Sequence, residues 1–201
     1  MFYKFWRTFF RIFLYVFARW RVVGIENVPS EGPLILVSNH VSNWDPVMIG
    51  CAMKRQVCYM AKAELFNVPV LGKVLPWLGV FPIKRGQSDI AALRTALEIL
   101  NNGSVLGMFP EGTRSQTGEM QKFKSGVAML VYKAKCPIVP IALINSKDVF
   151  KGWFKPVRVL IGKPFLPELP EGKASAEDLQ KITDEIESKV LLLRANEKLL
   201  S

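Results

Sequence analysis

The segment PLILVSNHVSNWDPVMIGCAM, residues 33–53, sets the architecture of this chain. It begins with an apolar run, Pro33–Ser38, which predicts a buried β-strand. It ends with Pro46–Met53, which predicts a helix because proline is favoured at the first helical position. A strand that passes through a short turn into a helix is the unit from which α/β proteins are built.

The same alternation continues along the rest of the chain. Further strands are predicted at Gln56–Ala61, Val80–Ile83, Ser104–Phe109, Pro137–Ile144 and Val157–Ile161. Further helices are predicted at Pro69–Trp77, Ser88–Asn101, Lys122–Lys135 and Ala176–Asn196, the last with a cap formed by Ser175 and Asp178. We therefore predict one α/β domain, with a largely parallel or mixed central sheet flanked by helices.

Two prolines, Pro137 and Pro140, lie in one of these predicted strands. Proline has no N–H to donate to a neighbouring strand. The segment Pro137–Ile144 is therefore predicted to be an edge strand or to be interrupted.

Composition restricts the partners of the chain. It has 201 residues, of which 50% are hydrophobic, and a net charge of +10, so an anionic partner is expected. The acidic surface of a membrane and nucleic acid are the two main candidates, and an acidic carrier protein or a phosphorylated substrate would also fit. No nucleic-acid-binding module is recognisable, so we expect no nucleic acid.

The three cysteines, Cys51, Cys58 and Cys136, are odd in number and have no CxxC spacing. They predict small buried side chains in a reducing compartment, without a disulfide framework. With one histidine and scattered carboxylates, no metal site is predicted.

Residues 1–22 contain five basic residues and no acidic one. Lys4, Arg7 and Arg11 fall on one face of a helix, and aromatic and aliphatic side chains cover the opposite face. The longest clean apolar run, Ile12–Ala18, is too short to cross a bilayer. We predict an amphipathic helix lying in the plane of an anionic membrane surface. The alternative is a helix packed on the core of its own domain, residues 23–201.

The only histidine, His40, lies between the first predicted strand and the helix that follows it. A neutral imidazole can accept a proton near neutral pH, and a nearby carboxylate can orient it. Asp45 supplies such a carboxylate, although its place before Pro46 also predicts an N-cap for the helix. From these residues alone, a catalytic pair and an ordinary loop histidine beside a helix cap are equally supported.

Two further tracts carry charge at the ends of predicted strands. The first, Phe109–Arg114, reads FPEGTR and has the chemistry of a tight turn. The second, Gly79–Arg85, ends in Lys84 and Arg85, which are either solvated charges or a clamp for a phosphate group. Lys122 and Lys124 add cations after the FPEGTR turn.

Together these tracts resemble the glycerolipid acyltransferase family, which includes the bacterial 1-acyl-sn-glycerol-3-phosphate acyltransferases. The family motif NHxxxxD matches Asn39, His40 and Asp45, and the motif FPEGTR matches Phe109–Arg114 without a departure. A glycine, an apolar stretch and an arginine match Gly79–Arg85 more loosely, and Pro137–Ile141 matches the fourth motif. The resemblance covers about residues 25–165.

The resemblance implies transfer of an acyl group from acyl-CoA or acyl carrier protein to the sn-2 hydroxyl of lysophosphatidic acid, without a cofactor. His40 would be the general base and Asp45 would orient it. Arg85, Lys84 and Arg114 would hold the phosphate of the acceptor. Glu111, Gly112 and Thr113 would lie in the acceptor site, with Glu111 bonded to a glycerol hydroxyl or bracing an arginine.

Other readings stay open at this point. The acceptor could instead be glycerol-3-phosphate or another lysophospholipid, and a non-catalytic membrane-surface module with the same fold is a further alternative. The intact pair His40 and Asp45 counts against a non-catalytic module. We expect an enzyme bound peripherally to the cytoplasmic face of the cell membrane, with residues 23–201 as its catalytic domain.

Overall fold

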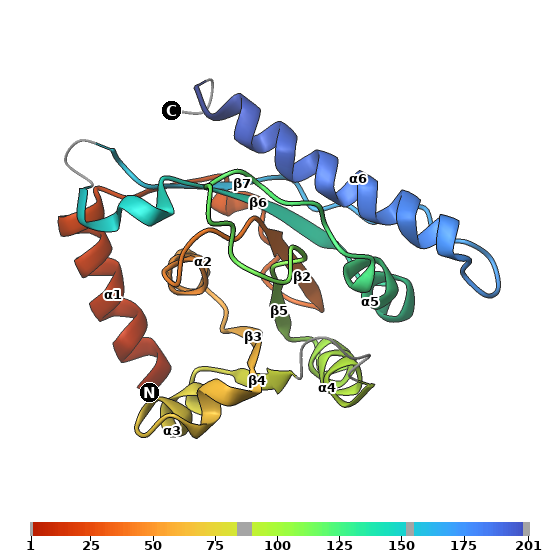
Figure 1. Ribbon diagram of the computed structural model, residues 1–201, viewed down its shortest axis with the longest axis horizontal. Helices are drawn as coiled ribbons and strands as arrows, with labels where there is room; N and C mark the ends of the chain where they lie inside the picture. Colours follow the sequence, from red (N-terminus) through yellow and green to blue (C-terminus); the bar gives the residue numbers. More distant parts are fainter. Residues whose placement is uncertain (1, 84–89, 152–154, 199–201) are drawn as a thin grey trace.

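A seven-stranded sheet runs through the computed structural model, which describes residues 2–83, 90–151 and 155–198 (Figure 1). The strand order is β1-β7-β6-β2-β5-β3-β4, and every pair is parallel except the antiparallel pair β6 and β7. The strands are β1 (Arg21–Val23), β2 (Leu34–Ser38), β3 (Val57–Lys62), β4 (Val80–Ile83), β5 (Val105–Met108), β6 (Ile138–Ile144) and β7 (Arg158–Ile161). The predicted α/β domain with a largely parallel sheet is confirmed.

Six α-helices and four short 3₁₀ helices are found among the described residues. The α-helices are α1 (Phe2–Ala18), α2 (Asp45–Ala52), α3 (Leu71–Trp77), α4 (Ile90–Asn101), α5 (Gly126–Ala134) and α6 (Ala176–Ala195). The 3₁₀ helices are η1 (Ile25–Asn27), η2 (Ala63–Asn67), η3 (Ser146–Lys151) and η4 (Asn196–Lys198). The predicted cap of α6 is present, since Ser175 and Asp178 form reciprocal side-chain-to-backbone hydrogen bonds.

The central strand β2 separates two layers of core packing, because successive side chains of a strand point to opposite faces. Leu34 and Leu36 pack in a cluster with residues of α1 and α2, whereas Ile35 and Val37 pack with residues of α4, α5 and α6. Figure 1 shows these helices on either side of the sheet. All five residues of β2 are buried, so its carboxyl end is a rigid base for the loop that contains His40.

The proline-containing strand β6 is central, between β2 and β7, so the prediction of an edge or interrupted strand is wrong. The carbonyl of Pro140 accepts a hydrogen bond from Gly162 N–H at 2.9 Å. The nitrogen of a strand residue points to the same side as its carbonyl, here toward β7. On that side Ile138 forms an isolated bridge with Phe165, and the continuous ladder begins where Ile141 pairs with Ile161. The missing N–H of Pro140 therefore falls between the bridge and the ladder.

Helix α1 packs on the domain along one side and is exposed along the other. Leu14 and Ala18 are fully buried in the core, and Arg7 donates to the carbonyls of Met53 and Lys54 at 3.1 and 2.7 Å. Arg7 therefore faces the domain, although the sequence pattern placed it with the other basic residues. The helix also ends earlier than the predicted segment 1–22, because Arg21–Val23 forms β1. Among the described residues, no helix is both long and apolar enough to cross a bilayer.

All three cysteines are free, and two of them, Cys51 and Cys136, are buried among apolar side chains, as predicted. Burial raises the pKa of Cys51 to about 12 and that of Cys136 to about 11. Cys58 is half-buried, and burial raises the pKa of its thiol too. These thiols are therefore poor nucleophiles at neutral pH.

Candidate active site

The loop after β2 brings His40 and Asp45 together. His40 Nδ1 lies 2.8 Å from Asp45 Oδ2, and the Asp45 side chain is fully buried. A carboxylate only accepts hydrogen bonds, so Nδ1 carries the proton and Nε2 keeps its lone pair. Nε2 has no hydrogen-bond partner within the described ranges. The imidazole also stacks on the ring of Phe109 from the end of β5, with centroids 4.2 Å apart.

Asp45 does not cap α2 as predicted. The N-cap is Trp44, which is already in the helical conformation, and Asp45 is the first helical residue. Its Oδ2 instead accepts the backbone N–H groups of Val41 and Ser42, both at 2.7 Å. The carboxylate therefore holds the loop and the imidazole together, because three donors from the loop converge on one buried oxygen.

Asn39 anchors the start of the same loop to the neighbouring strand β6. Its side-chain amide donates to Leu143 O at 3.0 Å, and its oxygen accepts Leu143 N–H at 2.8 Å. The Asn39 side chain is fully buried. The sequence marked Asn39 only as part of a motif. A polar residue directly after an apolar strand is the signal that points to such a structural role.

Glu111 in the FPEGTR turn holds the backbone of His40 from the other side. Its Oε1 accepts His40 N–H at 2.7 Å and its Oε2 accepts Gln121 N–H at 3.2 Å. Burial raises the pKa of the Glu111 carboxyl, whereas the N–H groups of His40 and Gln121 act to lower it. Ser115 N–H also donates to His40 O at 2.8 Å. Glu111 is only 2% exposed, and it contacts His40 through the backbone and not through the imidazole.

The remainder of the turn is open to solvent. Gly112 adopts a left-handed conformation with φ 75°, which glycine allows without strain. A Cβ atom at Gly112 would lie 2.9 Å from Lys124 Nζ, so the Lys124 side chain lies across the turn. Thr113 and Arg114 are exposed. The turn therefore presents one lysine and one arginine beside the loop that contains His40.

The other predicted phosphate ligands, Lys84 and Arg85, lie outside the described residues. The strand that precedes them, β4, ends at Ile83 and pairs with β3 in parallel. Among the described residues, no three His, Cys, Asp or Glu side chains are close enough to hold a metal ion.

Comparisons with known proteins agree with this geometry. An acyltransferase family model matches residues 19–144. The chloroplastic 1-acyl-sn-glycerol-3-phosphate acyltransferase BAT2 of Brassica napus is 32% identical over 170 residues, which cover 80% of this chain and 48% of that protein. The 1-acyl-sn-glycerol-3-phosphate acyltransferase of Bacillus subtilis is 29% identical over 200 residues, which cover 94% of this chain and 98% of that protein.

A solved structure extends the likeness to three dimensions. The crystal structure of the 1-acyl-sn-glycerophosphate (LPA) acyltransferase PlsC from Thermotoga maritima superposes with a TM-score of 0.72 at 29% identity. The alignment covers 96% of this chain and 80% of that chain. This chain spans about half the length of the plant relatives that it matches. The family match covers more than half of this chain and includes both His40 and the FPEGTR turn, and the chain thus belongs to the acyltransferase family.

Proposed function

We propose that this protein transfers a fatty acyl group from a thioester to the sn-2 hydroxyl of 1-acyl-sn-glycerol-3-phosphate, which yields phosphatidic acid. The observation that carries the proposal is the 2.8 Å contact from Asp45 to His40 Nδ1, which leaves Nε2 available as a base. The names of the matched proteins from Bacillus subtilis and Thermotoga maritima support this acceptor.

In the proposed reaction, His40 Nε2 removes the proton from the acceptor hydroxyl as its oxygen attacks the thioester carbonyl. The tetrahedral intermediate then collapses, the carbon–sulfur bond breaks, and the imidazolium returns the proton to the departing thiolate. The buried carboxylate of Asp45 stabilises the imidazolium between these two steps. General base catalysis of this kind contributes about 10²–10⁴ in rate.

The acceptor phosphate is proposed to bind beside the FPEGTR turn. Arg114 and Lys124 supply exposed positive charge there, and Lys84 and Arg85 are retained as proposed ligands. An arginine fork suits the geometry of a phosphate group, and binding the phosphate would hold the acceptor hydroxyl against His40. Gly112 lets the backbone approach the acceptor closely, and Thr113 is proposed to contact it. The donor is proposed to be acyl-CoA or acyl carrier protein, with no further cofactor.

The function is tested with the purified full chain and a panel of acceptors that contains lysophosphatidic acid, glycerol-3-phosphate and lysophosphatidylcholine. Acyl-CoA and acyl carrier protein are supplied as donors. We expect transfer to lysophosphatidic acid that is lost in His40→Ala and retained in Asn43→Ala, an exposed residue of the same loop. Exclusive transfer to another acceptor would overturn the proposed substrate, and full activity of His40→Ala would overturn the proposed base.

We also propose that the protein acts while bound to the cytoplasmic face of the cell membrane through α1. Phe5, Phe9, Ile12 and Val16 line the side of α1 that faces away from the domain, and Phe5 and Ile12 are 64% and 61% exposed. Apolar side chains at this spacing, on a helix with basic residues, are typical of helices that lie in a bilayer interface. At the start of α1, Phe2 contacts Trp77 of α3, which is itself exposed and extends the apolar surface.

Flotation with vesicles of anionic phospholipid tests this attachment. Each large apolar side chain removed from water stabilises binding by about 1.5–3 kcal/mol, so Phe5→Ser with Ile12→Ser should reduce vesicle binding at least tenfold. The matched control is Leu191→Ser with Leu192→Ser, which alters two exposed leucines on α6. Equal binding by the α1 variant and the wild-type protein would overturn the attachment through α1.

A further inference from the structure

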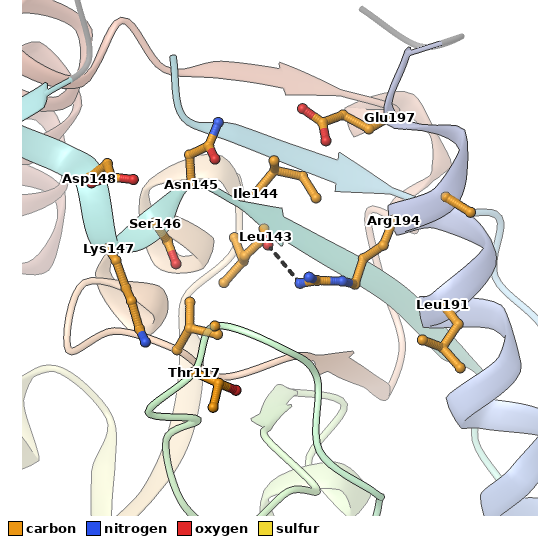
Figure 2. A pocket seen from close by; sticks show the side chains of 13 residues that line it. Thr117, Leu143, Ile144, Asn145, Ser146, Lys147, Asp148, Leu191, Arg194 and Glu197 are labelled. Atoms are coloured by element: carbon orange, nitrogen blue, oxygen red, sulfur yellow. Dashed lines mark hydrogen bonds between the residues drawn. The ribbon is translucent and has the colours of Figure 1, made fainter. Parts of the chain in front are cut away.

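A cavity of about 590 Å³ lies at the carboxyl end of β6, outside the residues that the proposed reaction uses (Figure 2). Its walls come from the last residues of β6, from η3, from the end of α6, and from Thr117 and Gly118 after the FPEGTR turn. Ligands of parallel α/β sheets bind outside the carboxyl ends of the strands. The volume is within the range of small-molecule sites, about 300–1,000 Å³.

The charges in the cavity leave a net positive potential. The lining includes two acidic residues, Asp148 and Glu197. Asp148 forms ion pairs with Lys151 and Lys155, and Glu197 forms one with Arg158 at 2.7 Å. The two cations of the lining, Lys147 and Arg194, form no ion pair within the described part of the chain. Among the residues that the structure describes, Lys147 donates only to the carbonyl of Gln116, at 2.7 Å, and Arg194 only to that of Leu143, at 3.4 Å.

A buried hydroxyl in the cavity wall also lacks a partner. Ser146 is fully buried at the start of η3, and its Oγ has no hydrogen bond to any described residue. Figure 2 shows this hydroxyl on the same side of the cavity as Lys147, with the Arg194 guanidinium reaching across from α6. Buried hydroxyls are almost always hydrogen-bonded, so this one points to a ligand that supplies an acceptor.

The cavity lies between the loop that contains His40 and the segment that follows the FPEGTR turn. Val41, the residue after His40, forms part of its wall. The carbonyl of Leu143 accepts from both Arg194 and Asn39, and Asn39 precedes His40. The sheet order puts β6 on one side of β2 and β5, which leads into the FPEGTR turn, on the other.

We propose that this cavity binds a phosphate group of a substrate through Arg194, Lys147 and the hydroxyl of Ser146. Guanidinium, ammonium and hydroxyl groups all donate to phosphate oxygens, and here they converge beside a positively charged wall. The proposal rests on the proposed acyl transfer, whose donor and acceptor both carry phosphate. If the cavity binds a phosphate of the donor, the acceptor can bind beside the FPEGTR turn. If the cavity binds the phosphate of the acceptor, the acceptor lies on the β6 side of His40 instead.

Calorimetric binding of glycerol-3-phosphate and of coenzyme A, each titrated into the full chain, tests the proposal without relying on acyl transfer. We expect Arg194→Gln and Lys147→Gln each to raise the Kd of one probe by about tenfold, the loss of one charge-assisted contact. Ser146→Ala should raise the same Kd by about threefold, because only a neutral donor is lost. The matched control is Lys189→Gln, since Lys189 lies on α6 over the Phe165 ring and outside this cavity.

The probe that responds identifies the source of the phosphate: coenzyme A indicates the donor and glycerol-3-phosphate the acceptor. Unchanged Kd values for both probes in Arg194→Gln and Lys147→Gln would overturn the proposal, as would an equal rise in Lys189→Gln. Because Lys147 is exposed, its variant remains informative if Arg194→Gln fails to fold. In active protein, Arg194→Gln should raise the KM of the identified substrate and leave the pH profile of kcat unchanged. The charge of Arg194 also acts to lower the pKa of the Glu111 carboxyl. A shifted pH profile with unchanged KM would therefore mean that Arg194 acts on Glu111 and would overturn the phosphate site.

Discussion

The loops that follow the adjacent strands β2 and β5 differ in how they use their polar groups. In the β2 loop, the side chains of Asn39 and Asp45 are fully buried, and their hydrogen bonds go to backbone groups or to the imidazole. Of the polar side chains from Glu111 to Ser115 in the β5 loop, only Glu111 and Ser115 are buried, while Thr113 and Arg114 are exposed to solvent. The first loop therefore holds the His40 imidazole in place, and the second supports the His40 backbone through Glu111 and leaves Arg114 exposed.

Two buried carboxylates, Asp45 and Glu111, bind the same loop but stand in different relations to the imidazole. Asp45 contacts the ring nitrogen directly, at 2.8 Å. Glu111 reaches only the backbone N–H of His40, at 2.7 Å. In the proposed reaction, Asp45 can therefore stabilise the charge that forms on His40, whereas Glu111 can only position His40.

Asp45→Asn should have the largest effect among the variants that separate these roles. An amide oxygen can still accept the N–H groups of Val41 and Ser42, so the loop should keep its shape. The neutral amide no longer stabilises the imidazolium, and kcat should fall by about 10²–10⁴. Steady-state kinetics with a thermal unfolding control measures this. A loss below tenfold would place Asp45 in the same positioning role as Glu111.

Glu111→Gln should reduce kcat less than Asp45→Asn does, and it should also reduce the stability of the fold. The glutamine oxygen can accept one of the two N–H groups that Glu111 binds, while its NH₂ group opposes the other. The N–H group that is left without an acceptor should lower the free energy of unfolding by about 1–3 kcal/mol, and kcat should fall by about tenfold as the loop loosens. Urea unfolding and kinetics measured on the same preparation test this prediction.

The pH dependence of stability supplies a control for the Glu111 substitution. Burial holds the pKa of Glu111 above its ordinary value, so the native protein binds this proton more tightly than the unfolded chain does. The wild-type protein should therefore lose stability as pH rises from the ordinary carboxyl pKa through the raised one. Glu111→Gln should remove that part of the slope, and an unchanged slope would contradict the raised pKa.

The sequence predicted the architecture because every central strand is an uninterrupted apolar run. All six predicted strands have counterparts whose ends agree within one residue, and only the three-residue strand β1 was missed. β1 lies within a basic, aromatic segment whose composition resembles that of α1, so no local signal separates them. The central position of β6 was not predicted, because it depends on how β6 pairs with β7. The continuous ladder between these two strands starts at Ile141, after Pro140.

In the candidate site, the contact between His40 and Asp45 was predictable from the sequence, but the other hydrogen bonds were not. His40 and Asp45 were paired from their spacing, yet the cap assigned to Asp45 was wrong because Trp44 already has helical backbone angles. The bond from Glu111 to the His40 backbone joins residues 71 positions apart and depends on the parallel pairing of β2 with β5. No sequence spacing encodes that contact.

Arg114→Gln should affect binding without affecting the chemical step. Arg114 is exposed, so the substitution should leave the fold intact. If the arginine holds the acceptor phosphate, KM for lysophosphatidic acid should rise by about tenfold with little change in kcat. Lys133→Gln, an exposed cation on α5, is the matched control for net charge. A fall in kcat with unchanged KM would contradict the contrast between the two loops.

Gly112→Ala should have the smallest effect, and it tests whether the exposed turn tolerates change that the β2 loop does not. Gly112 has φ 75°, whereas no residue from 39 to 45 has a positive φ. Forcing alanine into the left-handed region costs about 1–2 kcal/mol, so the melting temperature should fall by a few degrees. The three atoms nearest to the added Cβ all belong to the Lys124 side chain, with Nζ at 2.9 Å, and that flexible side chain can move aside. We therefore expect an unchanged kcat with a KM raised only a few-fold. A large fall in kcat would instead mean that the turn's backbone conformation is transmitted through Glu111 to His40, and that the two loops act as one unit.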